Sequence, residues 1–228
     1  MLAAAVAPGI ALLAYFYLSD RYDAEPLPMV ARMFLIGGLL VIPVMVVQRA
    51  FTLWFGDSEL VFSFATSAGV EEFFKWFVLY HLIFLHTYFD EPYDGIVYAT
   101  AVSLGFATVE NLLYALLVQP AGIGMLFLRA LLPVSGHALF GVFMGFFFGK
   151  AKFASGRSVR LRVALALLVP LFWHGLYDYL TLAVFSTSMV WLVVPFMFIL
   201  WVGGLRFVHR AHAVSPFRLL KREEEVNS

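Results

Sequence analysis

Seven long apolar stretches constrain the fold of this chain more than any other feature. They cover roughly residues 2–18, 30–54, 60–86, 94–118, 122–149, 161–185 and 189–208. The hydrocarbon core of a bilayer is about 30 Å thick, and a helix of about 20 apolar residues crosses it. Backbone polar groups in lipid must be satisfied internally, so each stretch is expected to be helical. The sequence therefore predicts an all-α fold, a polytopic transmembrane helical bundle of about seven spans.

The composition agrees with this prediction. Hydrophobic residues make up 62% of the chain and charged residues 13%, whereas soluble domains are about half apolar and about a quarter charged. The first stretch lacks the basic start of a secretory signal, so we expect a retained span. One membrane domain is predicted over residues 1–210, followed by a charged cytoplasmic tail at 211–228, of which we expect only the end, KREEEVNS, to be disordered. The absence of cysteine excludes disulfides and thiolate metal sites.

Basic residues predict the orientation in the membrane. They gather in the link after the first span, in the link between the fifth and sixth spans, and in the tail: Arg21, Arg32, Lys150, Lys152, Arg157, Arg160, Arg162, Arg206, Arg210, Arg218, Lys221 and Arg222. The positive-inside rule places these segments in the cytoplasm. With seven spans, the N-terminus lies outside and the C-terminus is cytoplasmic, as in a multi-pass protein of the cell membrane.

Ionisable residues inside four of the spans are the candidates for function. The set comprises Glu71, Glu72, Lys75, Glu110, His137, His174 and Asp178. Such groups are rare and costly in lipid and usually functional. Facing lipid would be expensive for each of them, so we expect them to converge on one interior site. Their positions along the spans place this site near the midplane or in the outer half of the membrane.

The charge of this set needs compensation. Four carboxylates face one lysine, which leaves an excess of three negative charges, or two if Arg129 reaches the site. Either protons are taken up or a cation binds. Two histidines among the candidate ligands make a divalent metal such as Zn²⁺ a plausible solution, and protonated carboxylates are the alternative.

Local spacing adds three expectations. His174 and Asp178 are four residues apart and share a helix face. Glu71 and Glu72 point about 100° apart, and the spacing to Lys75 favours Glu72 as the free carboxylate. Proline occurs four residues before each site histidine, at Pro133 and Pro170, where we expect kinks. The four-residue spacing of Gly141, Gly145 and Gly149 predicts a close helix-packing seam.

Four segments together resemble the PrsW family of intramembrane proteases, which is distantly related to the CAAX-protease and bacteriocin-processing group. They read EEFFK (71–75), GFATVEN (105–111), HALFG (137–141) and HGLYD (174–178). The entry to the second span, YLSDRYDAEP (17–26), is also similar. The resemblance implies an endopeptidase that makes the first cut in a single-pass membrane protein such as an anti-sigma factor. It also implies that Glu71 or Glu72 is the general base, with the first glutamate of the pair as the usual reading.

The resemblance further implies that His137 and His174 bind metal or stabilise the oxyanion, while Glu110 and Asp178 complete the site. CAAX-type relatives have histidine and asparagine where this chain has Glu110 and Asp178. Carboxylates would repel an oxyanion but suit a metal. We therefore expect a metalloprotease in which Glu110, His137 and His174 hold the ion, without the HExxH helix of other zinc proteases.

Other interpretations stay open at this point. A metal-independent glutamate protease of the CAAX type is the alternative within hydrolases. Buried carboxylates and histidines also occur in proton- or cation-coupled transporters, although the sequence has no convincing inverted repeat. A non-catalytic scaffold is the third class. The expected partners are a single-pass membrane protein and the lipid bilayer, not nucleic acid, and the expected cleavage lies near the extracytoplasmic side.

Overall fold

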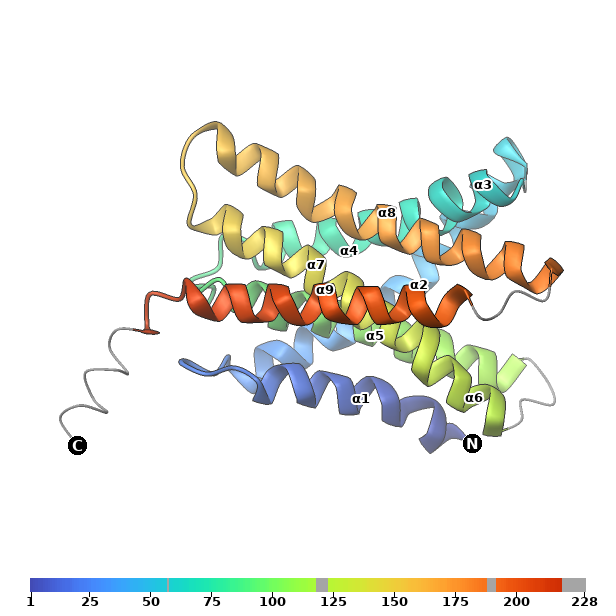
Figure 1. The fold of residues 1–228 in the computed structure, drawn as a ribbon, viewed down its shortest axis with the longest axis horizontal. Coiled ribbons are helices and arrows are strands. Elements are labelled where there is room, and N and C mark those ends of the chain that lie inside the picture. The colour runs from blue at the N-terminus through green and yellow to red at the C-terminus, as the bar shows by residue number, and fades with distance from the viewer. Residues whose placement is uncertain (57, 118–122, 188–191, 219–228) are drawn as a thin grey trace.

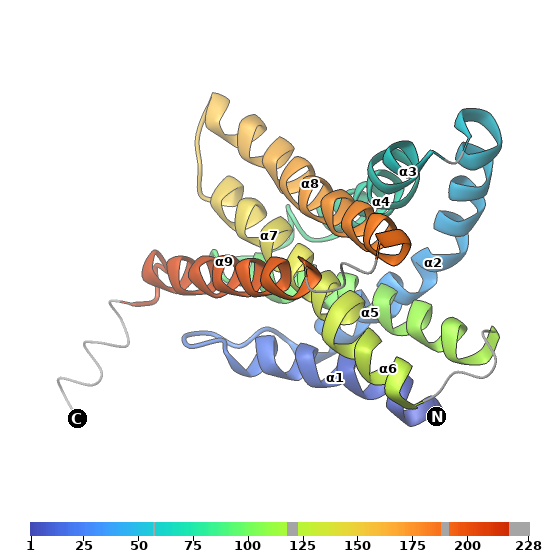
Figure 2. The ribbon, with the colours of Figure 1, turned by 45° about the vertical axis from the view of Figure 1, so that its right-hand side comes forward.

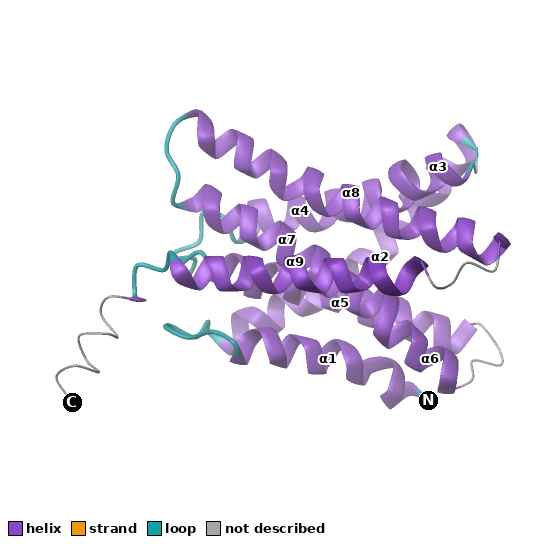
Figure 3. Ribbon diagram, in the orientation of Figure 1, coloured by secondary structure: helices purple, strands orange, loops and turns teal. Residues whose placement is uncertain are grey.

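The computed structural model describes residues 1–56, 58–117, 123–187 and 192–218, and these contain helices and connecting loops but no strand (Figure 3). In chain order the elements are α1 (Leu2–Leu18), α2 (Leu27–Phe55), α3 (Glu59–Val61), η1 (Phe62–Ser67), α4 (Ala68–Leu82), α5 (Asp94–Leu117), α6 (Ile123–Arg129), η2 (Ala130–Val134), α7 (Ser135–Lys152), α8 (Arg157–Thr187) and α9 (Val193–Ala213). The all-α prediction is confirmed.

Each predicted apolar stretch corresponds to helix in the structure. The third stretch is built from α3, η1 and α4 in succession, and the fifth from α6, η2 and α7. Among the described residues, five helical segments are long and apolar enough to cross a membrane, and α1 is a shorter apolar helix. The span count of seven and the orientation of the termini stay predictions. The predicted start of the last span, at 189, and the end of the tail lie outside the described residues.

Helix α5 is the centre of the bundle, and nearly all of its first 15 residues are buried. It packs against α1, α2 and α7, while α4 lies against α8 (Figure 1). Figure 2 shows α2 running from beside α1 toward α3. The predicted glycine seam is confirmed: a Cβ at Gly145 would collide with the carbonyl of Gly95, and one at Gly141 would lie 3.0 Å from the carbonyl oxygen of Ala99. Helices α5 and α7 can approach this closely only because side chains are absent there.

Two π-helical segments directly precede site-bearing helices. Segment η1 ends four residues before Glu71, and η2 contains Pro133 and ends three residues before His137. A proline lacks the backbone donor that a regular α-turn needs, and π-turns often occur next to functional sites. The break expected at Pro133 is therefore present. At Pro170, by contrast, α8 continues without a change of helix type.

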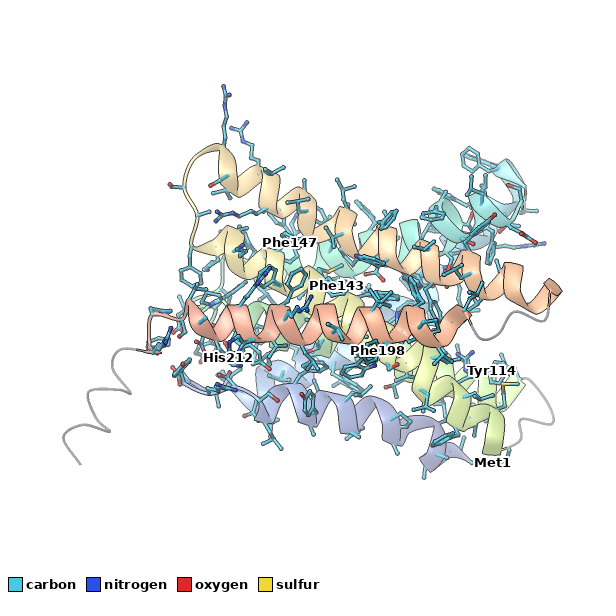
Figure 4. All side chains as sticks on the ribbon, in the orientation of Figure 1. Met1, Tyr114, Phe143, Phe147, Phe198 and His212 are labelled. Carbon is cyan, nitrogen blue, oxygen red and sulfur yellow. The ribbon has the colours of Figure 1, made fainter. Side chains whose placement is uncertain are left out.

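The two ends of the bundle differ in what they carry. Figure 4 shows Met1 and Tyr114 at one end and His212, near the end of α9, at the other. The His212 end also holds the loop that joins α7 to α8 (Figure 1), where the basic residues of that link lie. By the charge pattern this is the end predicted to face the cytoplasm.

Candidate active site

Four buried side chains form the centre of the site. Donor atoms of Glu71, Glu72, His137 and His174 all lie within 4.8 Å of one another. The glutamates come from α4, and the histidines come from α7 and α8. The convergence of distant spans expected from the sequence is thus present in the fold.

Lys75 is the cation at this centre. Its Nζ lies 2.8 Å from Oε1 of Glu72, 3.4 Å from Oε2 of Glu71 and 3.1 Å from Nδ1 of His137. The ammonium group also lies 4.5 Å from the centroid of the Phe106 ring. Spacing along the helix favoured Glu72 as the free carboxylate, but Lys75 is closer to Glu72. Residue spacing along α4 could not reveal which glutamate has the closer partners, because the second partner of Glu72 is His174, which comes from another helix.

His174 is oriented by a carboxylate on each side. Its Nδ1 lies 2.9 Å from Oε1 of Glu72, and its Nε2 lies 3.5 Å from Oδ2 of Asp178 and 4.0 Å from Oε2 of Glu71. The ring stacks on Phe140 with 4.7 Å between centroids. An ionised carboxylate only accepts hydrogen bonds, so Nδ1 donates to Glu72. In the neutral ring, Nε2 then keeps a lone pair, which is the usual arrangement of a metal-binding histidine.

His137 has a different set of neighbours. Its Nδ1 contacts Lys75, while Nε2 lies 3.2 Å from Oε2 of Glu110 and 3.9 Å from Oε2 of Glu71. Its backbone carbonyl accepts a 2.7 Å hydrogen bond from Ser103. Because the lysine ammonium donates, Nδ1 accepts and Nε2 carries the proton in the neutral ring. Nε2 could hold a metal in the other tautomer, in which Nδ1 would carry the proton and Lys75 would donate only to the two glutamates.

Glu110 joins the site from α5 and is the most accessible of its carboxylates, with 40% of its side chain exposed. The guanidinium of Arg129 lies 3.5 Å from Oε1 of Glu110 and donates from Nε to Oδ1 of Asn111 at 2.8 Å. Asn111 in turn donates to the carbonyl of Ala5 at 2.8 Å. Arg129 therefore does reach the site, and Asn111 anchors it to α1.

Gln48 belongs to the site although the sequence analysis did not identify it. Its Nε2 donates to Oε1 of Glu71 at 3.2 Å. It lies on α2 beside Arg49, and an uncharged amide 23 positions before Glu71 gives no spacing signal. The one available clue was a polar side chain inside an otherwise apolar span, and Arg49 next to it made Gln48 look like part of the polar end of that span. Asn111 was not identified for a similar reason: it is uncharged, and its hydrogen-bond partners come from α1 and α6.

A cavity of about 270 Å³ opens onto the site between α2 and α5. It has apolar walls, and its polar lining residues include both Glu71 and Glu110. The lining is Val41, Met45, Gln48, Glu71, Phe106, Glu110, Leu113, Tyr114, Leu117 and Arg129. Glu71 thus faces open space, whereas Glu72 is fully buried. The two adjacent glutamates occupy different environments.

The charges of the site match a divalent cation. Four carboxylates, Glu71, Glu72, Glu110 and Asp178, face two basic side chains, Lys75 and Arg129. With neutral imidazoles, two negative charges remain uncompensated. In the described part of the chain, the buried Oε2 of Glu72 has no hydrogen-bond partner. The donor set of imidazoles and carboxylates suits zinc or a similar metal, so the residues fit such an ion.

Comparisons with known proteins point to a single family. A family model described as "PrsW family intramembrane metalloprotease" matches residues 25–203. The chain is 50% identical over 212 residues to a protein named Protease PrsW from Geobacillus kaustophilus, with 92% of each chain covered. It is 45% identical over 220 residues to Protease PrsW of Bacillus subtilis, covering 96% of this chain and 99% of the relative. The Protease PrsW of Clostridioides difficile is 31% identical over 202 residues, with 83% of each covered. No solved structure matches the chain.

Proposed function

Because the chain belongs to the PrsW family of intramembrane metalloproteases, we propose that it cleaves a single-pass membrane protein, such as an anti-sigma factor, in a metal-dependent reaction. It is a multi-pass membrane peptidase. The observation that carries the proposal is the buried group of Glu71, Glu72, His137 and His174, together with the excess of two negative charges that remains when Glu110, Asp178, Lys75 and Arg129 are counted with it. This excess corresponds to the charge of one divalent ion, for which we propose Zn²⁺.

We assign the metal to His137 and His174, with Glu110 as a third ligand from outside the group of four donors that lie within 4.8 Å of one another. Nε2 of His174 keeps its lone pair because Nδ1 is held by Glu72, and Glu110 adjoins Nε2 of His137. Asp178 faces His174 from the same helix and completes the carboxylate set. When bound, a divalent ion supplies a Lewis acid that polarises the scissile carbonyl and activates water.

Glu71 is the proposed general base. It lies at the cavity, within 4.0 Å of Nε2 on both histidines, and Gln48 and Lys75 fix its carboxylate. It accepts a proton from the attacking water and delivers it to the leaving amide nitrogen. Glu72 acts as a positioning residue, because its hydrogen bonds go to His174 and Lys75.

The cavity supports a substrate that approaches from the membrane. Its apolar wall is formed by α2 and α5, and its polar lining includes Glu71 and Glu110. Such a surface suits a transmembrane segment whose backbone becomes exposed to water at the carboxylates. The site lies in the middle of the bundle or toward the end that holds Met1, which is the end predicted to face outside. We therefore propose cleavage near the extracytoplasmic side. Mapping of the product ends tests this point.

The decisive experiment combines cleavage with metal analysis on the full chain in proteoliposomes. We expect wild-type protein to cleave a single-pass substrate, to contain bound metal, and to lose cleavage on chelation. His174→Ala should lose both metal and cleavage, whereas Glu71→Gln should lose cleavage but keep the metal. Cleavage that survives chelation in protein without metal would contradict the metal-dependent mechanism and favour a CAAX-type glutamate protease. Loss of the metal in Glu71→Gln would make Glu71 a ligand instead of the base.

A further inference from the structure

A second group of carboxylates lies at the opposite end of α5 from Glu110. Asp20 follows α1, Glu91 precedes α5, and Asp94 is the first residue of α5. Oxygen atoms of these three side chains lie within 4.8 Å of one another. Glu110 comes 16 residues after Asp94, or about 24 Å along a helix that rises about 1.5 Å per residue. This group is therefore separate from the active site.

Burial without hydrogen-bond partners distinguishes this group from an ordinary acidic surface. Glu91 and Asp94 are both 0% exposed. In the part of the chain that the structure describes, neither carboxylate oxygen of Glu91 has a hydrogen-bond partner, and Oδ1 of Asp94 also has none. Buried polar atoms are normally satisfied, so each exception needs an explanation. Three such oxygens at one point require a partner, which is either a cation or protons shared between the carboxylates.

The surrounding residues hold the group in place. Oδ2 of Asp94 accepts backbone hydrogen bonds from Asp90 at 2.8 Å and Glu91 at 2.7 Å, which leaves Oδ1 free. The carboxylate of Glu25 accepts from the hydroxyl of Tyr98. Lys152 attracts Asp94 electrostatically, but its Nζ donates to the backbone carbonyls of Phe84 and His86, at 2.8 and 3.0 Å.

Electrostatics agrees with the geometry. Burial raises the pKa of the Glu91 carboxyl to about 7 and that of Asp20 to about 6, and the charge of Asp20 further raises the pKa of Glu91. The same cause raises the pKa of Glu25 to about 7. Ionised forms are therefore costly here unless positive charge is added. A cation would supply that charge and displace protons as it binds.

We infer that Asp20, Glu91 and Asp94 form a second metal site, which takes a hard divalent cation such as Mg²⁺ or Ca²⁺. All three ligands offer oxygen alone, which suits these ions rather than zinc. Such an ion would tie the loop after α1 to the start of α5. The end of α9 packs at the same place, where the His212 ring stacks on Tyr93 with 4.1 Å between centroids. The site would thus join two elements beside the end of α9, at the end of the bundle opposite Met1.

Mn²⁺ binding to the purified full chain, followed by electron paramagnetic resonance, tests this inference. The measurement uses the Glu71→Gln/His174→Ala background, so that the active site does not contribute. We expect saturable Mn²⁺ binding that Mg²⁺ or Ca²⁺ displaces and that weakens at least about tenfold in Glu91→Gln. Asp20 is less buried, and Asp20→Asn should also weaken Mn²⁺ binding. This variant tests the inference if Glu91→Gln does not fold.

The control is Glu59→Gln, which removes an exposed carboxylate outside the cluster and should leave Mn²⁺ binding unchanged. Equal Mn²⁺ affinity in the background protein and both cluster variants would overturn the inference. So would thermal stability that responds to pH but not to any of the three cations, since protons alone would then satisfy the carboxylates.

Discussion

Oε1 of Glu72 lies 2.9 Å from Nδ1 of His174 and couples α4 to α8 at the centre of the site. The same oxygen lies 2.8 Å from Nζ of Lys75. Glu72 is therefore committed to two buried partners, and its neighbour Glu71 is the carboxylate that faces the cavity. The two adjacent glutamates therefore have different partners, and we expect their replacement to have different effects.

Replacing Glu71 by glutamine is expected to lower kcat for substrate cleavage by about 10²–10⁴-fold, the usual contribution of a general base. Glutamine keeps the shape of the side chain, so the thermal midpoint should change little. The rate is measured on a single-pass substrate in proteoliposomes, with Glu59→Gln as the matched control. Near-normal cleavage by Glu71→Gln, together with an inactive but folded Glu72→Gln, would assign the base to Glu72.

Replacing Lys75 by methionine is expected to cost about 3–5 kcal/mol of stability, because it leaves two buried carboxylates without their cation. Adding Glu72→Gln should recover part of this loss, since one of those charges is then removed. Denaturant titration of the two single variants and the double variant gives the coupling energy. Lys150→Met, at an exposed position, is the control and should stay within about 0.5 kcal/mol of wild type. Strictly additive effects of Lys75→Met and Glu72→Gln would argue against the pairing.

Arg129→Gln is expected to lower kcat about tenfold by releasing Glu110, while the protein remains folded. Arg129→Lys should recover only part of the activity, because an ammonium group cannot hold Glu110 and Asn111 as the planar guanidinium does. Kinetics that separate kcat from KM check this expectation. A change in KM alone would instead place Arg129 in substrate binding.

Gly145→Ala is expected to destabilise the bundle by about 2 kcal/mol or more, since the new methyl group would overlap the Gly95 backbone across the α5–α7 seam. Gly203→Ala is the matched control, because a Cβ there would meet Phe143 at an ordinary 3.7 Å. Alanine favours helix over glycine, so this control should be neutral or slightly stabilising. Similar thermal midpoints for the two variants would show that the seam tolerates separation.

The carboxylates at the start of α5 predict how stability varies with pH. The pKa of Glu91 is raised from its ordinary 4.5 to about 7, chiefly by burial, so the folded protein binds a proton that the unfolded chain has already lost. In cation-free buffer, stability should therefore be highest below about pH 4.5 for this group and fall as the pH rises to about 7. The thermal midpoint of wild type minus that of Glu91→Gln isolates the effect. A difference that stays constant between pH 5 and 8 would contradict the raised pKa.

The helices and the convergence of the buried ionisable residues followed from the sequence for clear physical reasons. Apolar length predicts a helix wherever lipid forbids unpaired backbone groups, and the predicted and observed boundaries differ by only a few residues. Charged groups in such helices are too costly to face lipid, which predicted that Glu71, Glu72, His137 and His174 would meet. The proline at 133 also indicated the break before His137.

Only the tertiary structure decided how these groups divide their contacts. His174 lies 102 residues from Glu72, so no spacing rule within α4 could tell which glutamate it would hold. Gln48 and Asn111 entered the site in the same way, as uncharged residues whose partners come from other helices. The buried cluster of Asp20, Glu91 and Asp94 depends on how the loops close at one end of the bundle. The sequence by itself determined which residues must avoid lipid, because the free-energy cost of placing a charged side chain in lipid depends on that residue alone. Their pairing is decided by distances between helices, which exist only once the bundle has packed.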